Sequence, residues 1–366
     1  MIEDHILERL KADVSRYFPF YDLKILDDGI AFFCRIREET LDEDFEMLRE
    51  ALSSYGFIPI LRREGGEHLI YVIKAKEKRE VPVWVNIFLL LAAILTTTLT
   101  GSLLVSNRTN LWEFGALKDM LDPKNLLDGF FLFSLPLLTI LGVHEMSHYY
   151  ASRYHGVRTS LPFFIPVPPI FKFNIGTFGA VISSRDPIPN RKALFDIGLS
   201  GPLAGFLVAI PISVYGLIKS IPVPPGSVPS ETILQPPPLF TIISLLLNIP
   251  IDYRIILHPT AFAGWVGLIV TAVNLFPIGQ LDGGHVTRAI FGENQRYIGW
   301  FSLILLLFTG WFFFAILIAL LAGVYHPPPL NDLTPVDLKR KVLFILAVII
   351  LILCFTPFPV LSMGES

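Results

Sequence analysis

Charge is scarce in this sequence. Aspartate, glutamate, lysine and arginine make up 17% of the 366 residues, whereas hydrophobic residues make up 52%, and the mean hydropathy is +0.58. A chain with so little charge and so many apolar residues is typical of a protein that contacts lipid, not of a water-soluble enzyme. Its length allows two or three ordinary domains.

An excess of positive charge and a set of cysteines are missing too. The formal net charge is −3, so no basic stripe is left over, and we expect no nucleic-acid partner. The two cysteines, Cys34 and Cys354, lie at opposite ends of the chain in dissimilar contexts. A disulfide framework and a cysteine-based metal site are therefore not expected.

The start of the sequence does not have the pattern of a cleavable targeting segment. Residues 1–16 carry charges of both signs and apolar residues at helical spacing, which is typical of an amphipathic helix and not of a signal or transit peptide. The first segment of lipid length comes after residue 82 and would act as an internal anchor. This pattern favours a multi-pass protein of a prokaryotic cell membrane.

Residues 1–80 predict a small α+β domain. They carry most of the charge density, and the expected order is a helix, two strands around "DDG", a second helix and two strands around "EGGE". A segment of about eighty residues is small but able to fold alone. It contains no recognisable catalytic cluster, so its role stays open.

Residues 83–358 are expected to form a membrane domain, because their apolar runs can cross a hydrocarbon layer of roughly 30 Å. The predicted spans are 83–105, 129–154, 193–218, 260–281, 298–324 and 341–358. The run 298–324 fits one long tilted helix or a tight pair of shorter ones, so it crosses once or twice. The fold class is thus a polytopic α-helical membrane protein of about six transmembrane helices with a small N-terminal α+β soluble domain.

Residues 161–190 are apolar but interrupted by prolines, and they predict a re-entrant loop with a β-strand around 176–184. Non-helical backbone at membrane depth is tolerated only where protein or a wet cavity covers it. We therefore expect this region to lie beside a cavity.

Lysines and arginines next to the spans predict the orientation. The basic residues that flank the first three spans are Lys74, Lys76, Lys78, Arg79, Arg153, Arg158, Arg185, Arg191 and Lys192. One scheme fits the first four spans: the N-terminal domain lies in the cytosol, and the chain then crosses out, in, out and in. The cytosolic ends of spans two and four would then lie together.

The motif "HEMSH" lies inside the second predicted span. His144 and His148 are four residues apart, so a helix places both imidazoles on one face, about one turn apart. Neutral imidazoles suit Zn²⁺, and Glu145 can reach a water there as general base. Each of these three ionisable side chains would cost roughly 2.5–3.5 kcal/mol in a membrane span if it had no function. We therefore predict a site for one catalytic zinc ion.

The third ligand of this site has to come from another part of the chain. The metzincin spacing would need a histidine where Tyr154 stands, and His155 is one residue off. Asp282, at the end of the fourth span in "NLFPIGQLDGGH", is the strong candidate, because the two glycines after it let the backbone approach a metal closely. His285 is the competing ligand.

Together, "HEMSH" and the later "NLFPIGQLDGG" resemble the site-2 protease family of intramembrane zinc metalloproteases. The stretch "GTFGAVISSRDPIPNRKALFDIGLSGPLAG" is similar to the prokaryotic and chloroplast-type branch, which carries an N-terminal soluble domain. The resemblance covers residues 83–325, and two well-separated motifs in the right order make it specific.

The resemblance implies a role for each matching residue. The family's histidine ligands fall on His144 and His148, its aspartate ligand on Asp282 and its catalytic glutamate on Glu145. The family's asparagine falls on Asn274, whose amide would donate to the peptide carbonyl or the developing oxyanion, or else hold a helix interface. Where the family often has an asparagine after a GP pair, this chain has glycine in "GPLAG", so only close helix packing is expected there.

These observations predict an intramembrane zinc metalloprotease whose substrates are transmembrane helices of other membrane proteins in the lipid bilayer, cut near their cytosolic ends. The substrate helix must unwind, and the predicted strand would hold it extended by β-augmentation. The residues of that strand with a predicted substrate-binding role are Gly176, Thr177, Phe178 and Gly179.

Two other classes of function compete with this reading. A membrane zinc transporter or sensor without hydrolysis predicts ionisable groups repeated along the spans, but the sequence has one cluster at one depth. A catalytically idle scaffold is disfavoured because Glu145 is retained. The physiological substrate and the oligomeric state do not follow from the sequence.

Overall fold

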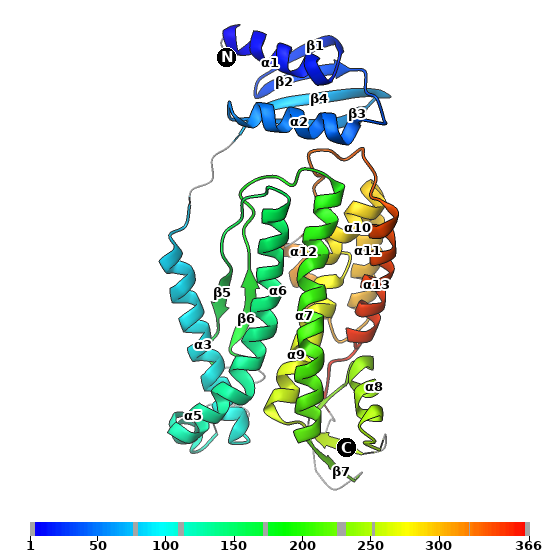
Figure 1. The fold of residues 1–366 in the computed structure, drawn as a ribbon. Coiled ribbons are helices and arrows are strands. Elements are labelled where there is room, and N and C mark those ends of the chain that lie inside the picture. The colour runs from blue at the N-terminus through cyan, green and yellow to red at the C-terminus, as the bar shows by residue number, and fades with distance from the viewer. Residues whose placement is uncertain are drawn as a thin grey trace.

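The N-terminal part of the chain forms a small α+β unit beside a helical body (Figure 1). The structure is a computed structural model that describes residues 4–75, 80–108, 113–170, 175–224, 232–250, 253–321 and 323–362. The elements of the first unit are α1 (Asp4–Tyr17), β1 (Phe20–Leu26), β2 (Gly29–Cys34), α2 (Leu41–Ser53), β3 (Phe57–Glu64) and β4 (Glu67–Lys74). Its antiparallel sheet has the order β1-β2-β4-β3. The small α+β domain predicted from the sequence is confirmed.

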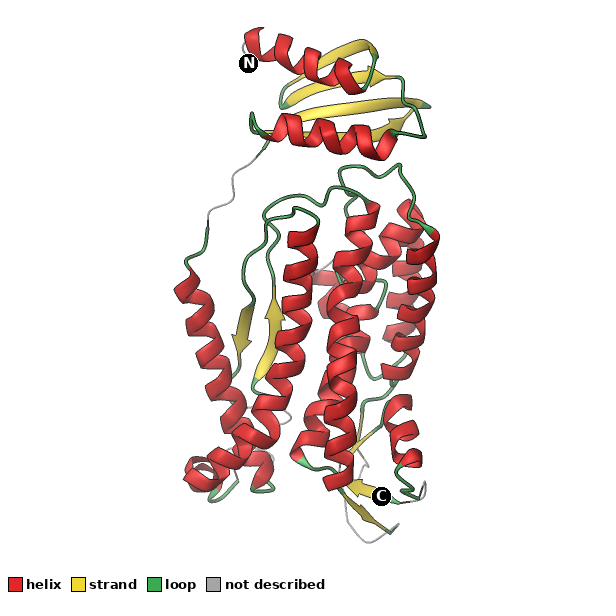
Figure 2. Ribbon diagram, in the orientation of Figure 1, coloured by secondary structure: helices red, strands yellow, loops and turns green. Residues whose placement is uncertain are grey.

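The helical body consists of long and short helices (Figure 2), and its described strands form three two-stranded sheets. Its helices are α3 (Val83–Val105), α4 (Ala116–Leu121), α5 (Pro123–Gly129), the π-helical turn η1 (Phe130–Ser134), α6 (Leu135–Tyr154), α7 (Arg191–Lys219), α8 (Pro238–Leu246), α9 (Pro259–Leu275), α10 (Asp282–Phe291), the 3-10 turn η2 (Gly292–Asn294), α11 (Gln295–Leu307), α12 (Phe312–Leu321) and α13 (Leu338–Cys354). Its strands are β5 (Phe163–Pro166), β6 (Thr177–Val181), β7 (Ile221–Val223), β8 (Thr232–Leu234), β9 (Arg254–Ile256) and β10 (Val360–Ser362).

Among the described residues, three helices are long and apolar enough to cross a membrane: Val83–Val105, Pro123–Tyr154 and Arg191–Lys219. They correspond to the first three predicted spans, whereas the full number of six spans stays a prediction. The fourth predicted span ends early, at Leu275, because Phe276 precedes Pro277 and takes the extended backbone that a following proline favours. Asp282 therefore does not end a span but begins the separate helix α10.

The apolar run 298–324 is not one long helix. Turn residues 308–311 divide it into α11 and α12, and the N–H of Gly310 donates to the carbonyl of Pro357, 2.9 Å away. The structure therefore favours the pair of shorter helices over the single tilted one.

The predicted re-entrant region contains two short antiparallel strands, β5 and β6, which lie between α3 and α6 (Figure 1). Polar side chains of α3 bond to the backbone that enters this hairpin: Asn86 donates to the carbonyls of Leu161 and Pro162, and Thr96 donates to that of Gly176. The apolar helix thus satisfies non-helical backbone that lipid would leave unpaired. Residues 171–174 of this region, and Lys76, Lys78 and Arg79 of the orientation argument, lie outside the described residues.

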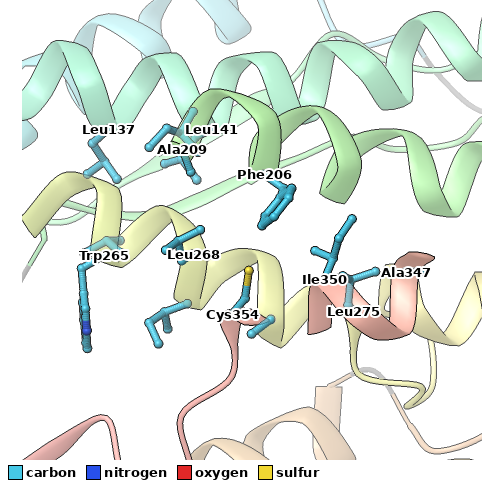
Figure 3. Close-up of a cluster of buried hydrophobic side chains, with 14 of the residues drawn as sticks. Leu137, Leu141, Phe206, Ala209, Trp265, Leu268, Leu275, Ala347, Ile350 and Cys354 are labelled. Carbon is cyan, nitrogen blue, oxygen red and sulfur yellow. The ribbon is translucent and has the colours of Figure 1, made fainter. Parts of the chain in front are cut away.

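One apolar core joins α6, α7, α9 and α13, and Figure 3 shows its centre. Leu141 of α6, Phe206 of α7, Leu268 of α9 and Ile350 of α13 are among the buried members of this cluster. Because well-packed interiors yield little to strain, the core holds these helices, and the side chains they carry, in fixed relation.

The N-terminal domain docks on the helical body through backbone pairing. The N–H of Leu61, in β3 at the edge of the sheet, donates to the carbonyl of Leu330 at 2.9 Å. Leu330 is 6% exposed and packs in the apolar core of the N-terminal domain, although it lies in the connection between α12 and α13. An ion pair between Lys192 and Asp42 adds to the contact.

We expect Leu330→Ala to loosen the N-terminal domain, because truncation of a buried leucine leaves a cavity and costs about 2–5 kcal/mol. Hydrogen exchange of residues 4–75 in the full-length protein measures the effect, as faster exchange in β2, β3 and α2. Leu338→Ala is the matched control, since Leu338 is 76% exposed. Equal exchange in the two variants would show that Leu330 does not belong to that core.

Candidate metal centre

Two histidines of α6 face the same point inside the helical body. The Nε2 atoms of His144 and His148 lie 3.1 Å apart, as expected for residues one helical turn apart. The Nδ1 atom of His148 lies 2.7 Å from the carbonyl oxygen of Ile197 in α7. A Nδ1–H that donates to this carbonyl leaves Nε2 of His148 with its lone pair turned toward His144.

Asp282 completes the cluster. Its Oδ2 lies 3.2 Å from Nε2 of His144 and 3.2 Å from Nε2 of His148. Asp282 reaches this position because α10 begins directly after the turn that follows α9. A Cβ on Gly283 would lie 2.0 Å from the carbonyl oxygen of Leu275, so this glycine allows α10 to start against the end of α9. The glycine serves the packing of two helices and not, as the sequence suggested, an approach of backbone to metal.

The three donor atoms have the geometry of a zinc site. Donors of a tetrahedral zinc ion with bonds near 2.0 Å lie about 3.3 Å apart, and the three distances here are 3.1, 3.2 and 3.2 Å. Two imidazoles and one carboxylate are also the ligand types of catalytic zinc sites, in which the fourth position is left to water or substrate. The residues therefore fit zinc.

The competing ligands of the sequence analysis lie elsewhere. Among the described residues, the group of metal-binding side chains found here contains His144, His148 and Asp282 only. His285 packs its ring against that of His326, with centroids 4.4 Å apart. Nε2 of His155 lies 2.9 Å from Oδ2 of Asp196 in α7, so His155 contacts this carboxylate beyond the end of α6.

Of the two residues predicted to act on the substrate, Asn274 contacts the cluster and Glu145 is the neighbour of His144 in the chain. Glu145 follows His144 in α6 and is 8% exposed, so it lies inside the protein next to the first histidine. The amide Nδ2 of Asn274, near the end of α9, lies 3.3 Å from Nε2 of His144. The structure thus brings Asn274 to the same point from a third helix.

The strand β6, which contains most of the predicted substrate-binding residues, lies on the α6 side of β5 (Figure 1). Thr177 is buried, and its hydroxyl donates to the carbonyl of Ile165. Phe178 is 81% exposed, and both Gly176 and Gly179 have positive φ. This strand therefore has one side fixed by the hairpin and one large side chain exposed.

The close helix packing predicted for "GPLAG" is present, and it is packing of α7 against the two histidines of α6. Gly201 and Gly205, the two glycines of "GPLAG", lie against the histidine rings: a Cβ would stand 2.1 Å from Nε2 of His148 and 3.1 Å from Nδ1 of His144, respectively. The spacing of two small residues four apart predicts helix packing in membranes. It does not tell which side chains the glycines face.

A helical body with spans of membrane length and a His–His–Asp donor set beside a glutamate defines a metal-dependent hydrolase of membranes. The family model of "Peptidase family M50" matches residues 132–317, about half of the chain. The chain therefore belongs to peptidase family M50, and with this donor set it is a zinc metalloprotease, which confirms the predicted family and enzyme class.

Curated relatives agree with this assignment. The chain is 28% identical over 400 residues to "Probable zinc metalloprotease EGY1, chloroplastic" of Arabidopsis thaliana. The matched region covers 98% of this chain and 70% of that relative. The chain is 32% identical over 238 residues to the protein of the same name in Oryza sativa subsp. japonica, with 60% of this chain and 39% of the relative covered. It is 29% identical over 240 residues to "Probable zinc metalloprotease EGY2, chloroplastic" of Arabidopsis thaliana, with 62% and 42% covered. The chain thus spans less than half the length of the latter two proteins.

We expect Gly201→Ala to abolish metal binding, because the new methyl group would overlap the ring of His148 and turn it away from the other donors. Zinc content of the purified protein measures this, as a loss of most of the bound metal. Leu207→Ala, at an exposed position of the same helix, is the control and should retain zinc. Full zinc content in Gly201→Ala would contradict the close contact.

Proposed function

We propose that this protein is an intramembrane metalloprotease that hydrolyses peptide bonds in transmembrane segments of other membrane proteins. The observation that carries the proposal is the position of the donor set: two of its three residues lie in α6, inside the apolar segment Pro123–Tyr154. Ionisable side chains in such a segment are expensive unless they have a function. A protease site within a span acts on chains that lie in the same membrane.

We assign the zinc ligands to His144, His148 and Asp282. When bound there, zinc would lower the pKa of a water molecule and polarise the scissile carbonyl. Glu145 takes the proton of the attacking water and returns it to the leaving amine. The Nδ2 amide of Asn274 donates a hydrogen bond to the oxygen of that carbonyl, where negative charge develops.

The site lies toward the end of α6 that is nearer the N-terminal domain (Figure 1). His148 precedes the end of α6 at Tyr154 by six residues, which is about 9 Å along a helix axis. Water therefore has a short way to travel from that side. We assign this side to the cytosol and the protein to the cell membrane, on the basis of the basic residues that flank the spans.

A zinc transporter or sensor would need further binding groups along the membrane normal. Within the described ranges, one cluster of three metal-binding side chains is found. The observation favours chemistry at one depth over passage across the membrane.

Glu145→Gln should abolish cleavage and leave zinc in place, because the amide keeps the shape of the side chain but accepts no proton. Cleavage of a reporter transmembrane segment in proteoliposomes, together with zinc content, measures both effects; a rate loss of at least 100-fold is expected. Glu293→Gln, at an exposed position in η2, is the matched control. Normal cleavage by zinc-loaded Glu145→Gln protein would refute the assigned chemistry.

We further propose that β6 holds the substrate as an added strand. Peptide bonds in a helix are shielded by their own hydrogen bonds, so the segment to be cut must first become extended. An edge strand supplies main-chain partners for such a segment. In support, β6 pairs with β5 on one side only among the described strands, and its Phe178 is exposed.

Phe178→Pro removes one backbone N–H from β6, and Phe178→Ala removes only the ring. If the main chain binds the substrate, the proline variant should lose cleavage about tenfold or more, which corresponds to about 1.4 kcal/mol, while the alanine variant loses little. Zinc content should stay normal in both variants. Equal activity of the two variants would argue against an added strand.

A further inference from the structure

The connection between α12 and α13 touches two distant parts of the molecule. Its residues 324–332, named here the 324–332 segment, contact the backbone and the helix around Asp282. The same segment carries Leu330, which pairs with the N-terminal domain. The two sets of contacts are only a few residues apart in the chain, so the segment connects the N-terminal domain to the candidate metal centre.

Toward the metal centre, the 324–332 segment holds the turn that precedes Asp282. The N–H of Gly279 donates to the carbonyl of Val324 at 3.1 Å. Gln295 donates through Nε2 to the carbonyls of Val324 and Pro277, at 3.2 and 3.3 Å. Its Oε1 accepts the N–H of His326 at 3.1 Å. These bonds fix the backbone of residues 277–279 against the segment.

The same segment also holds the helix that begins with Asp282. His326 packs its ring edge-on against that of His285, one turn into α10. Asp332 forms an ion pair with Arg288, which lies nearly two turns into α10 and is 1% exposed. A buried guanidinium depends strongly on its partner, because loss of one member of a buried pair leaves an uncompensated charge.

Toward the N-terminal domain, the contact consists of main-chain bonds and one arginine. Both the N–H of Leu61 and Nη1 of Arg62 donate to the carbonyl of Leu330, each at 2.9 Å. On its other side, Leu330 donates to the carbonyl of Ile188, just before α7. Leu330 is thus the point at which β3, the 324–332 segment and the start of α7 are joined.

We propose that the N-terminal domain sets the position of Asp282 relative to His144 and His148 through the 324–332 segment, with Asp332 as the main positioning residue. This inference rests on the proposed role of Asp282 as a metal ligand. Metal ligands must be held within about 0.5 Å of their working geometry, and Asp282, the assigned ligand outside α6, begins the helix that this segment contacts. A partner or ligand that shifts the N-terminal domain would therefore change metal affinity and activity through a physical contact.

The test uses Co²⁺ in the full-length protein, because its visible absorption reports ligand geometry without any turnover. Asp332→Asn should lower Co²⁺ affinity about tenfold, the low end of the effect of losing a residue bonded directly to a ligand, because α10 loses the partner of its Arg288 and Asp282 can shift. The absorption band should change as well. The variant should reduce kcat more than KM, because the substrate contacts are unchanged. Hydrogen exchange of residues 279–288 in the metal-free protein should become faster.

Arg62→Met is the second variant, since it lies in the N-terminal domain and does not leave Arg288 unpaired. It should shift Co²⁺ affinity and exchange of residues 279–288 in the same direction, by a smaller factor. Arg63→Met is its matched control, because Arg63 is the next residue of β3 and is exposed. Its Co²⁺ affinity should equal that of the unmodified protein.

The outcomes separate this inference from the proposed function. Unchanged Co²⁺ affinity, absorption and exchange in folded Arg62→Met protein that still cleaves would overturn the inference and leave the protease intact. If the unmodified protein cleaves no membrane substrate but both variants shift Co²⁺ binding, the proposed function fails and the positioning role stands. If Asp332→Asn does not fold, the Co²⁺ affinity and hydrogen exchange of Arg62→Met, compared with those of Arg63→Met, decide the question by themselves.

Discussion

The meeting of one carboxylate with two imidazoles is the constraint on which the rest of this structure depends. Oδ2 of Asp282 and Nε2 of His148 lie 3.2 Å apart across 134 positions of sequence. No local structure can bring such atoms together, so the packing of α6, α7, α9 and α10 has to do it. The apolar core shared by α6, α7, α9 and α13 is the scaffold for that contact (Figure 3). The glycines of α7 let the histidine rings lie directly against the helix backbone.

A second constraint comes from the apolar surroundings of this site. A protease needs water and an extended substrate, and both conflict with a helix in lipid. Polar side chains on the mostly apolar helix α3 supply hydrogen bonds that lipid cannot. Asn86 and Thr96 of this helix donate to backbone carbonyls of the β5–β6 region. The hairpin thereby lies between α3 and α6 without unpaired backbone at those points. Hydrogen bonds from one transmembrane helix therefore allow a non-helical hairpin to lie within the membrane body.

The N-terminal domain and the membrane body are joined by parts of the chain that carry little signal in the sequence. The connection between α12 and α13 is short and rich in proline, and it reads as a simple linker. In the structure, its Leu330 is part of the N-terminal core and its Asp332 pairs with a buried arginine of α10. The pKa of the Asp332 carboxyl is raised, because burial raises it more than the nearby arginines lower it. The contact therefore combines a main-chain bond, apolar packing and a desolvated charge pair.

The sequence by itself determined the composition class, the small α+β domain and the identity of the two motifs. Helical periodicity and the spacing of His144 and His148 are local properties, so one face of one helix follows from them. The placement of Asp282, and not His285, beside the two histidines and the break between α11 and α12 were decided by tertiary structure. Each of these depends on which backbone or side chain from a distant segment fills the space beside the residue. The sequence gives the identity of each residue, but the neighbour from a distant segment is known only from the tertiary structure.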